Sequence, residues 1–198
     1  MMSAEQQTEL RINQDRATRT NDGLWGHPLC LVLVCLTTTV FPDHPVITSV
    51  FAIVFAAQAA IRYILIRRLA RPSVHLAKTW RSRMVSLLMG SGLLWGLLSA
   101  WSCFIYGFQH INSYLLLLYH AAISVVGAEM FQHNRRLGQW YLVALFLPLA
   151  AVQLAFPGPQ SWGALCTFSF YILFLSVRLC RFCATYASRL AETRDLEA

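Results

Sequence analysis

The stretch that decides the fold is WRSRMVSLLMGSGLLWGLLSAWSCFIY, residues 80–106. It begins with a basic collar containing Trp80, Arg81 and Arg83, and no charged residue occurs from Met84 to Tyr106. These 23 residues span about 35 Å as a helix, which is long enough to cross a bilayer core ~30 Å thick. We therefore predict a transmembrane helix. A buried helix of a soluble protein is disfavoured because similar uncharged runs recur along the chain.

Small residues recur at every fourth position inside this run, at Gly92, Gly96 and Ala100. Residues four apart lie on the same face of a helix. Small side chains on one face allow the backbone of a neighbouring helix to approach closely in a membrane. We predict that this face is the central helix-packing surface of the protein.

The composition indicates an all-α, polytopic integral membrane protein. Of the 198 residues, 57% are hydrophobic and only 13% are charged, whereas soluble domains carry about 25% charged residues. The net charge of +7 does not indicate a nucleic-acid partner, because the basic residues stand at the ends of apolar runs. The first 23 residues are polar, so no cleavable signal peptide is expected.

The apolar runs predict six transmembrane helices in three hairpins, with a basic loop at 67–83 and tight turns at 42–45 and 157–159. A kink is expected at Pro148 in the fifth helix. The expected organisation is a polar segment over 1–23, a membrane domain over 24–182 and a cytoplasmic helical connector over 183–198. The predicted helices cover residues 24–41, 46–66, 84–106, 112–131, 139–156 and 160–182.

The Lys and Arg residues all fall on one side of this arrangement. Most lie in the termini and in two loops, and Arg62, Arg178 and Arg181 lie in the last turns of the second and sixth helices. The three opposite turns contain none. Cytoplasmic loops carry the excess of Lys and Arg, so both termini are predicted to be cytoplasmic.

Polar residues inside a membrane span are the candidates for function. The predicted fourth helix has most of them, and His120 is the strongest, because its imidazole can hydrogen-bond a ligand or titrate. We predict a ligand site near the outer leaflet that combines Trp101, Tyr114, His120 and Ser124. The alternative is a histidine whose hydrogen bonds are satisfied by a neighbouring helix.

Two charged residues are expected at similar depth near the inner end of the bundle. Pairing Arg62 with Glu129 would remove two costly charges from lipid, so we predict a structural ion pair, with a proton relay as the alternative. The amides of Gln58 and Gln153 are interpreted as helix–helix contacts rather than ligand groups.

Metal and redox sites are weakly indicated. Asp43, His44 and His110 lie in outer turns and offer metal-binding atoms, but they have no spacing motif. Cys180 and Cys183 form a single CxxC without a second pair, and their role stays open. We predict no cofactor and no metal. Phosphate-binding loops, HExxH and the rhomboid nucleophile motif are absent from the sequence, so an enzyme is disfavoured.

A combination of short motifs resembles a known family. The Trp–Arg collar is followed by Gly90-Ser91-Gly92-Leu93-Leu94-Trp95-Gly96, then by Gly127-Ala128 and by Leu147-Pro148. This resembles the six-helix N-terminal membrane sensory region of bacterial histidine kinases and GGDEF-type diguanylate cyclases, over about residues 24–182. The resemblance implies an inner-membrane sensor that signals to a cytoplasmic catalytic domain. The chain has no kinase or GGDEF sequence of its own.

The function predicted from the sequence is therefore a sensory input domain that is embedded in the bilayer and forms a homodimer. It would perceive a small apolar ligand or a membrane condition. We expect the natural protein or its partner to continue beyond Ala198 into a kinase or cyclase domain. The alternatives are a small transporter or channel, which needs a polar path through the bundle, and a membrane scaffold subunit.

Overall fold

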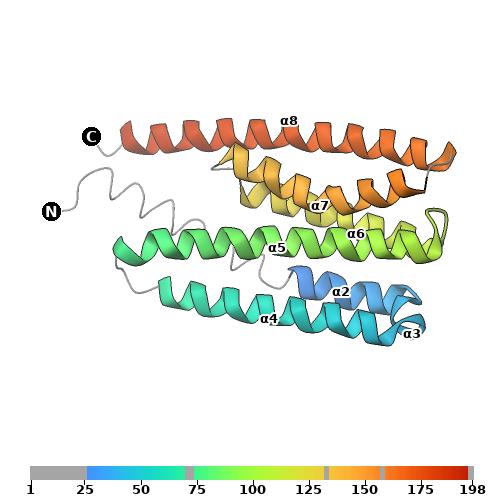
Figure 1. Cartoon of the computed structure of the whole chain (residues 1–198). Coiled ribbons are helices and arrows are strands. Elements are labelled where there is room, and N and C mark those ends of the chain that lie inside the picture. Colours follow the sequence, from blue (N-terminus) through green and yellow to red (C-terminus); the bar gives the residue numbers. More distant parts are fainter. Residues whose placement is uncertain (1–25, 70–73, 132–133, 157–158, 196–198) are drawn as a thin grey trace. The chain divides into compact units, whose positions relative to one another are not determined.

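The computed structural model describes residues 26–69, 74–131, 134–156 and 159–195, and within these ranges every regular element is a helix (Figure 1). Among the described residues, five helices are long and apolar enough to cross a membrane. The chain is thus an all-α protein with the helix lengths and composition of a multi-pass membrane protein. The elements are α2 (Gly26–Thr37), α3 (Val40–Asp43), α4 (Pro45–Leu69), α5 (Val74–Tyr106), α6 (Ile111–Met130), α7 (Arg135–Ala155) and α8 (Pro159–Asp195).

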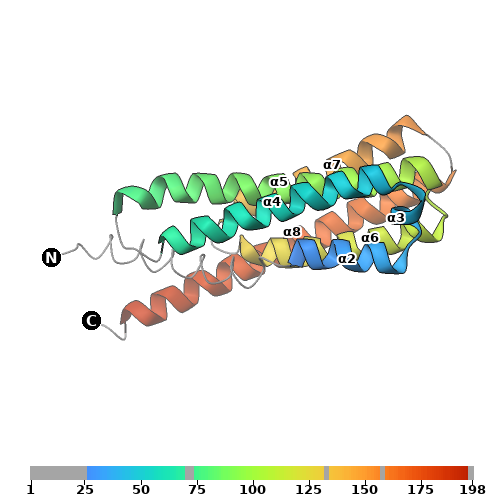
Figure 2. The same ribbon diagram turned by 90° about the horizontal axis from the view of Figure 1, so that it is seen from below.

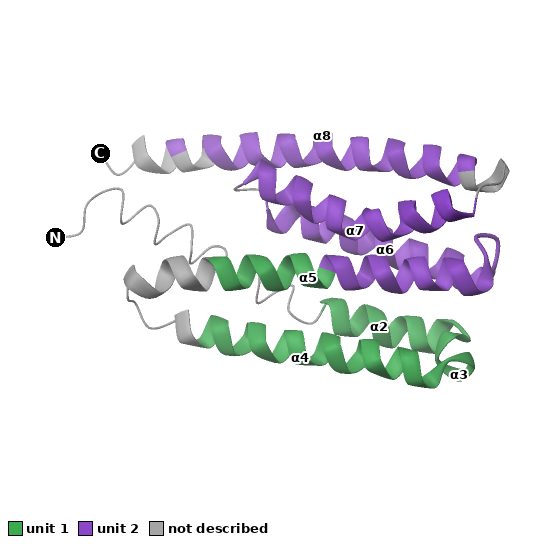
Figure 3. Cartoon of the chain, in the orientation of Figure 1, with its two compact units in different colours: residues 1–91 green, residues 92–198 purple. Residues whose placement is uncertain are grey.

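The chain divides into two compact units, residues 1–91 and 92–198 (Figure 3). The division falls within α5, so each unit contains a part of that helix. The first unit contains α2, α3, α4 and the beginning of α5. The second contains the rest of α5 together with α6, α7 and α8.

The predicted first span, 24–41, is wrong as a single helix. Helix α2 has 12 residues, fewer than the roughly 20 that cross a bilayer, so a sixth span is not confirmed. The hydroxyls of Thr37 and Thr38 donate to the carbonyls of Leu33 and Val34, at 2.7 and 2.6 Å, in the last turn of α2. Such back-bonding of Ser and Thr bends helices, and here it coincides with the end of α2.

The predicted turn at 42–45 is also different in the structure. Pro42 and Asp43 belong to the short helix α3, and only His44 separates it from α4. The Thr39 hydroxyl donates to the Asp43 carboxylate over 2.6 Å and so spans this short helix. Proline is compatible with the first turn of a helix, where its missing N–H has no partner to lose.

The predicted basic loop, 67–83, is largely helical. Helix α4 continues to Leu69 and α5 begins at Val74, so Lys78, Arg81 and Arg83 lie within α5. No Gly or Pro occurs between Val74 and Met89 to interrupt the helix. The apolar part of α5 that could span a membrane begins at Ser82.

Within the first unit, α2 lies beside α4 (Figures 1 and 2). The His27 ring stacks on Phe55, with ring centroids 6.1 Å apart. Gln58 on α4 accepts a hydrogen bond from the Ser91 hydroxyl on α5 over 2.7 Å. The prediction that Gln58 makes a helix–helix contact is confirmed.

In the second unit, a side chain caps the N-terminus of α6 and another caps that of α7. A ring nitrogen of His110 accepts from the Asn112 N–H at 3.2 Å, and the Asn134 side chain accepts from the Leu137 N–H at 3.2 Å. These bonds satisfy N–H groups that a helix start leaves open. Between α5 and α6 the chain turns at Gly107, whose φ of 80° is costly for residues with a Cβ.

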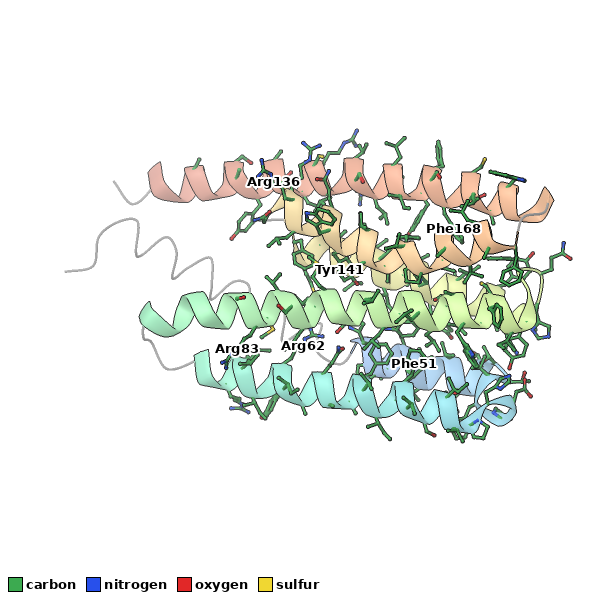
Figure 4. The ribbon with its side chains drawn as sticks, viewed as in Figure 1. Phe51, Arg62, Arg83, Arg136, Tyr141 and Phe168 are labelled. Carbon is green, nitrogen blue, oxygen red and sulfur yellow. The ribbon has the colours of Figure 1, made fainter. Side chains whose placement is uncertain are left out.

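Glycines of α5 and α6 pack against α7 within this unit. A Cβ at Gly92 or at Gly127 would strike the ring of Tyr141, the buried α7 residue marked in Figure 4. A Cβ at Gly96 would strike the backbone carbonyl of Leu145. The missing side chains therefore let α5 and α6 approach α7 closely.

Helix α8 is unbroken from Pro159 to Asp195, and it packs along α7 and α6. Its membrane-compatible part ends at Ser188, so the helix continues beyond that part. No Gly or Pro occurs between Ala164 and Asp195 to end it.

Candidate functional site

His120 lies at the middle of α6 and is only 1% exposed. Its Nδ1 is 3.0 Å from the Ser99 hydroxyl oxygen on α5. The ring also hydrogen-bonds to the backbone of Trp95, one turn before Ser99. The predicted residue is thus buried between helices and held through one ring nitrogen.

The two ring nitrogens of His120 have different surroundings. Nδ1 contacts the Ser99 hydroxyl, and either atom of that pair can be the donor, depending on the tautomer of the ring. Nε2 has no hydrogen-bond partner among the described residues.

One aromatic ring packs directly against His120, and two more pack against that ring. The Phe146 ring of α7 meets His120 edge-on, with centroids 4.7 Å apart. Phe146 in turn contacts Phe168 and Tyr171 of α8, at centroid distances of 6.1 and 6.0 Å. Phe168 lies on the side of α8 toward α7 (Figure 4). Edge-to-face pairs of this kind fix ring orientations.

Ser124 belongs to the same region through Tyr171. The Tyr171 hydroxyl donates to the Ala121 carbonyl at 2.9 Å and lies 3.1 Å from the Ser124 hydroxyl. Ser124 also donates to that carbonyl, at 2.6 Å. Tyr171 was not predicted, although a tyrosine in the middle of the last apolar run is a polar signal of the same kind as those on α6.

Two predicted members of the site lie on other helix faces. Tyr114 is 54% exposed, and six residues separate it from His120, which places them about 120° apart around α6. Trp101 is half-buried and stands two residues after Ser99, on nearly the opposite side of α5. The structure therefore brings together His120 with Ser99 and Ser124 with Tyr171. Tyr114 and Trp101 stand on other faces of α6 and α5.

Two further polar side chains of the second unit were not predicted as site residues. Gln153 on α7 is 1% exposed, and neither its amide oxygen nor its nitrogen has a partner among the described residues. Its interpretation as a simple helix–helix contact is not supported by a hydrogen bond. Ser102 on α5 is also buried, and its hydroxyl has no hydrogen-bond partner among the described residues.

The two predicted ion-pair residues belong to different units. Arg62 is buried on α4 and lies within electrostatic range of His27 (Figure 4). Glu129 is exposed near the end of α6. The Arg62–Glu129 pair stays a prediction.

A metal centre has no support in the part of the chain that the structure describes. No three His, Cys, Asp or Glu side chains in these ranges are grouped to hold a metal ion. His110 is engaged as a helix cap, and Asp43 accepts the Thr39 hydroxyl. Cys180 and Cys183 are both free thiols.

No family model, curated protein or solved structure matches the chain.

Proposed function

We propose that the chain is the membrane-embedded sensory input domain of a bacterial signal-transduction protein in the inner membrane. In this proposal the second unit perceives a small ligand or a membrane condition, and α8 carries the change to a cytoplasmic output domain of the kinase or cyclase type. The protein acts as a homodimer whose α8 helices meet beyond the membrane.

The observation that carries the proposal is the unbroken length of α8. The helix continues from its membrane-compatible part, Trp162–Ser188, to Asp195. A continuous helix transmits small shifts or rotations along its axis without loss at a flexible joint. The contacts of Tyr171 with Ala121 and of Phe168 with Phe146 couple α8 to the region around His120.

A cysteine at Tyr186 is expected to crosslink between two copies in native membranes, in a background where the six native cysteines are replaced. Short helices are marginal alone, and pairing with a second copy would stabilise this end of α8. The matched control is Ser188→Cys, because residues two apart point to nearly opposite sides of a helix. Absence of a Tyr186→Cys dimer band, or equal bands for both positions, would contradict the paired connector.

Replacing His120 by Ala is expected to change signalling output, whereas Tyr114→Phe is expected to leave it unchanged. The His120 side chain is buried among α5, α6 and α7, while Tyr114 is exposed. The measurement is output against dose of candidate stimuli, using the chain joined to its cyclase or kinase domain. Identical dose–response curves for wild type and His120→Ala would remove His120 from the sensing region.

A small transporter or channel is the second candidate function. It is favoured by the buried polar residues His120, Gln153 and Ser102, which lie within apolar helices of one unit. Substrate-specific flux into proteoliposomes containing the purified chain would decide for transport. A sensory domain should give no flux above that of empty liposomes.

A further inference from the structure

Four polar atoms in the second unit are buried without a hydrogen-bond partner among the described residues. They are the His120 Nε2, both amide atoms of Gln153 and the Ser102 hydroxyl, on side chains at most 1% exposed and without partners among the described residues. A polar atom in a bilayer core that is not hydrogen-bonded is strongly unfavourable, because no water is available there to compensate. One orphaned atom is a common imperfection, but four on three neighbouring helices require a common explanation.

The register of α6 and α7 shows how two of these side chains approach each other. Gly127 of α6 faces Tyr141 of α7, and His120 of α6 faces Phe146 of α7. The residue number therefore falls along α6 in the direction in which it rises along α7. The two helices are therefore antiparallel. Gln153 follows Phe146 by seven residues, which is two turns, and so lies on the same face of α7.

Side-chain direction brings the His120 ring and the Gln153 amide closer still. Every Cα–Cβ bond of a helix tilts toward the N-terminus of that helix. On α7 this tilt directs Gln153 back toward Phe146, and on α6 it directs His120 toward Ser113. Because the helices are antiparallel, the two side chains lean toward each other.

Ser102 approaches the same place from α5. Its backbone carbonyl accepts the Ser113 hydroxyl at 3.3 Å, which places it beside the outer part of α6. The tilt on α5 directs its side chain back toward Ser99, the residue that contacts His120. From helix geometry we therefore expect the side chains of His120, Gln153 and Ser102 to point toward one level of the second unit.

We propose that His120, Gln153 and Ser102 form a buried polar site that binds a small, uncharged hydrogen-bonding ligand of the size of one or two water molecules. The His120 Nε2 accepts or donates a hydrogen bond, depending on the tautomer, the Gln153 amide both donates and accepts, and the Ser102 hydroxyl does either. A bound molecule with two to four such partners satisfies all four atoms at once.

The ligand is uncharged because its surroundings offer no opposite charge. No Lys, Arg, Asp or Glu occurs in residues 92–106, 111–128 or 137–155. An unpaired ion is far more costly than a neutral polar molecule in such a medium. The Phe146 ring that packs against His120 is apolar as well. The site is a property of the second unit and does not depend on the proposed sensory function.

Solid-state NMR of the histidine-labelled chain in proteoliposomes tests the site with water as the probe. The His120 nitrogens are assigned by their absence in His120→Gln. Magnetisation is expected to pass from water to the His120 Nε2. No transfer to Nε2 in the wild-type protein would overturn the proposal.

Gln153→Leu is expected to reduce that water signal at least twofold, because a partner of the bound molecule is removed. It should also lower the unfolding midpoint by roughly 2–10 °C, since a buried ligand loses hydrogen bonds. If the site binds nothing, Gln153→Leu should raise the unfolding midpoint, because Leu would then replace two unsatisfied polar atoms by apolar ones. A raised midpoint with an unchanged water signal would therefore reject the site.

Two more variants complete the test. Ser102→Ala removes one hydroxyl with little change of volume, and it decides the outcome by the same water signal if Gln153→Leu does not fold. The matched control is Gln58→Leu, the same substitution at a glutamine that accepts from Ser91. That control should leave the His120 water signal unchanged, and a reduction there as large as in Gln153→Leu would count against a local site.

Discussion

Gly96→Leu is expected to abolish correct assembly of the second unit and to lose at least about 3 kcal/mol of stability, at the upper end of overpacking effects. A Cβ at this position already strikes the backbone carbonyl of Leu145 and approaches the Pro148 ring. Backbone cannot rotate away as a side chain can, so α5 and α7 must separate. Lipid offers no hydrophobic drive to restore the contact.

Yield of monodisperse protein in mild detergent and its thermal unfolding midpoint measure this effect. Gly96→Ala should show a smaller loss of about 1–3 kcal/mol. The matched control is Gly163→Ala, because a Cβ at Gly163 of α8 meets no atom within 4 Å. Equal midpoints for Gly96→Ala and Gly163→Ala would show that α5 does not pack against α7 through Gly96.

The second large effect is expected at Tyr141, which fills the space that Gly92 and Gly127 leave open. The ring is 1% exposed and also contacts Phe131, with centroids 5.5 Å apart. Tyr141→Ala should cost about 3–5 kcal/mol, the range for deleting a buried aromatic side chain. Loss of thermal stability in detergent measures it.

A double-mutant cycle distinguishes this packing from a general loss of stability. Gly127→Ala alone should destabilise the protein, because the new methyl group overlaps the Tyr141 ring. In the Tyr141→Ala background the obstacle is absent, so the same change should cost little or even stabilise the helix. Additive effects of the two substitutions would contradict direct packing of Tyr141 on Gly127.

Most of the secondary structure could be predicted because the signals for membrane helices are local. Uncharged runs of about 20 residues identify α4, α6, α7 and the apolar parts of α5 and α8 without knowledge of neighbours. The errors arose where local signals compete. Thr37 and Thr38 end α2 inside an apolar run, and the basic residues after Val74 continue a helix that was expected to begin later.

The site was harder to predict because the sequence shows which residues are polar but not what they face. His120, Ser124 and Tyr114 all interrupt an apolar run, yet His120 and Ser124 are buried and Tyr114 is exposed. Tyr171 and Gln153 became relevant only through partners on other helices. Tyr171 contacts Ala121 across 50 positions of sequence, a distance over which composition contains no information about pairing.

The sequence alone therefore determined that this chain is helical, that it has the composition of a membrane protein and that small residues on α5 form one face. These properties follow from the solvent, because a bilayer requires backbone hydrogen bonds to close within each helix. Tertiary structure decided which polar groups meet. Ser99 contacts one nitrogen of His120, and Tyr171 contacts Ser124. The positions of these side chains depend on the register and the separation of neighbouring helices. The close approach of Gly96 to the Leu145 backbone is one such contact between helices.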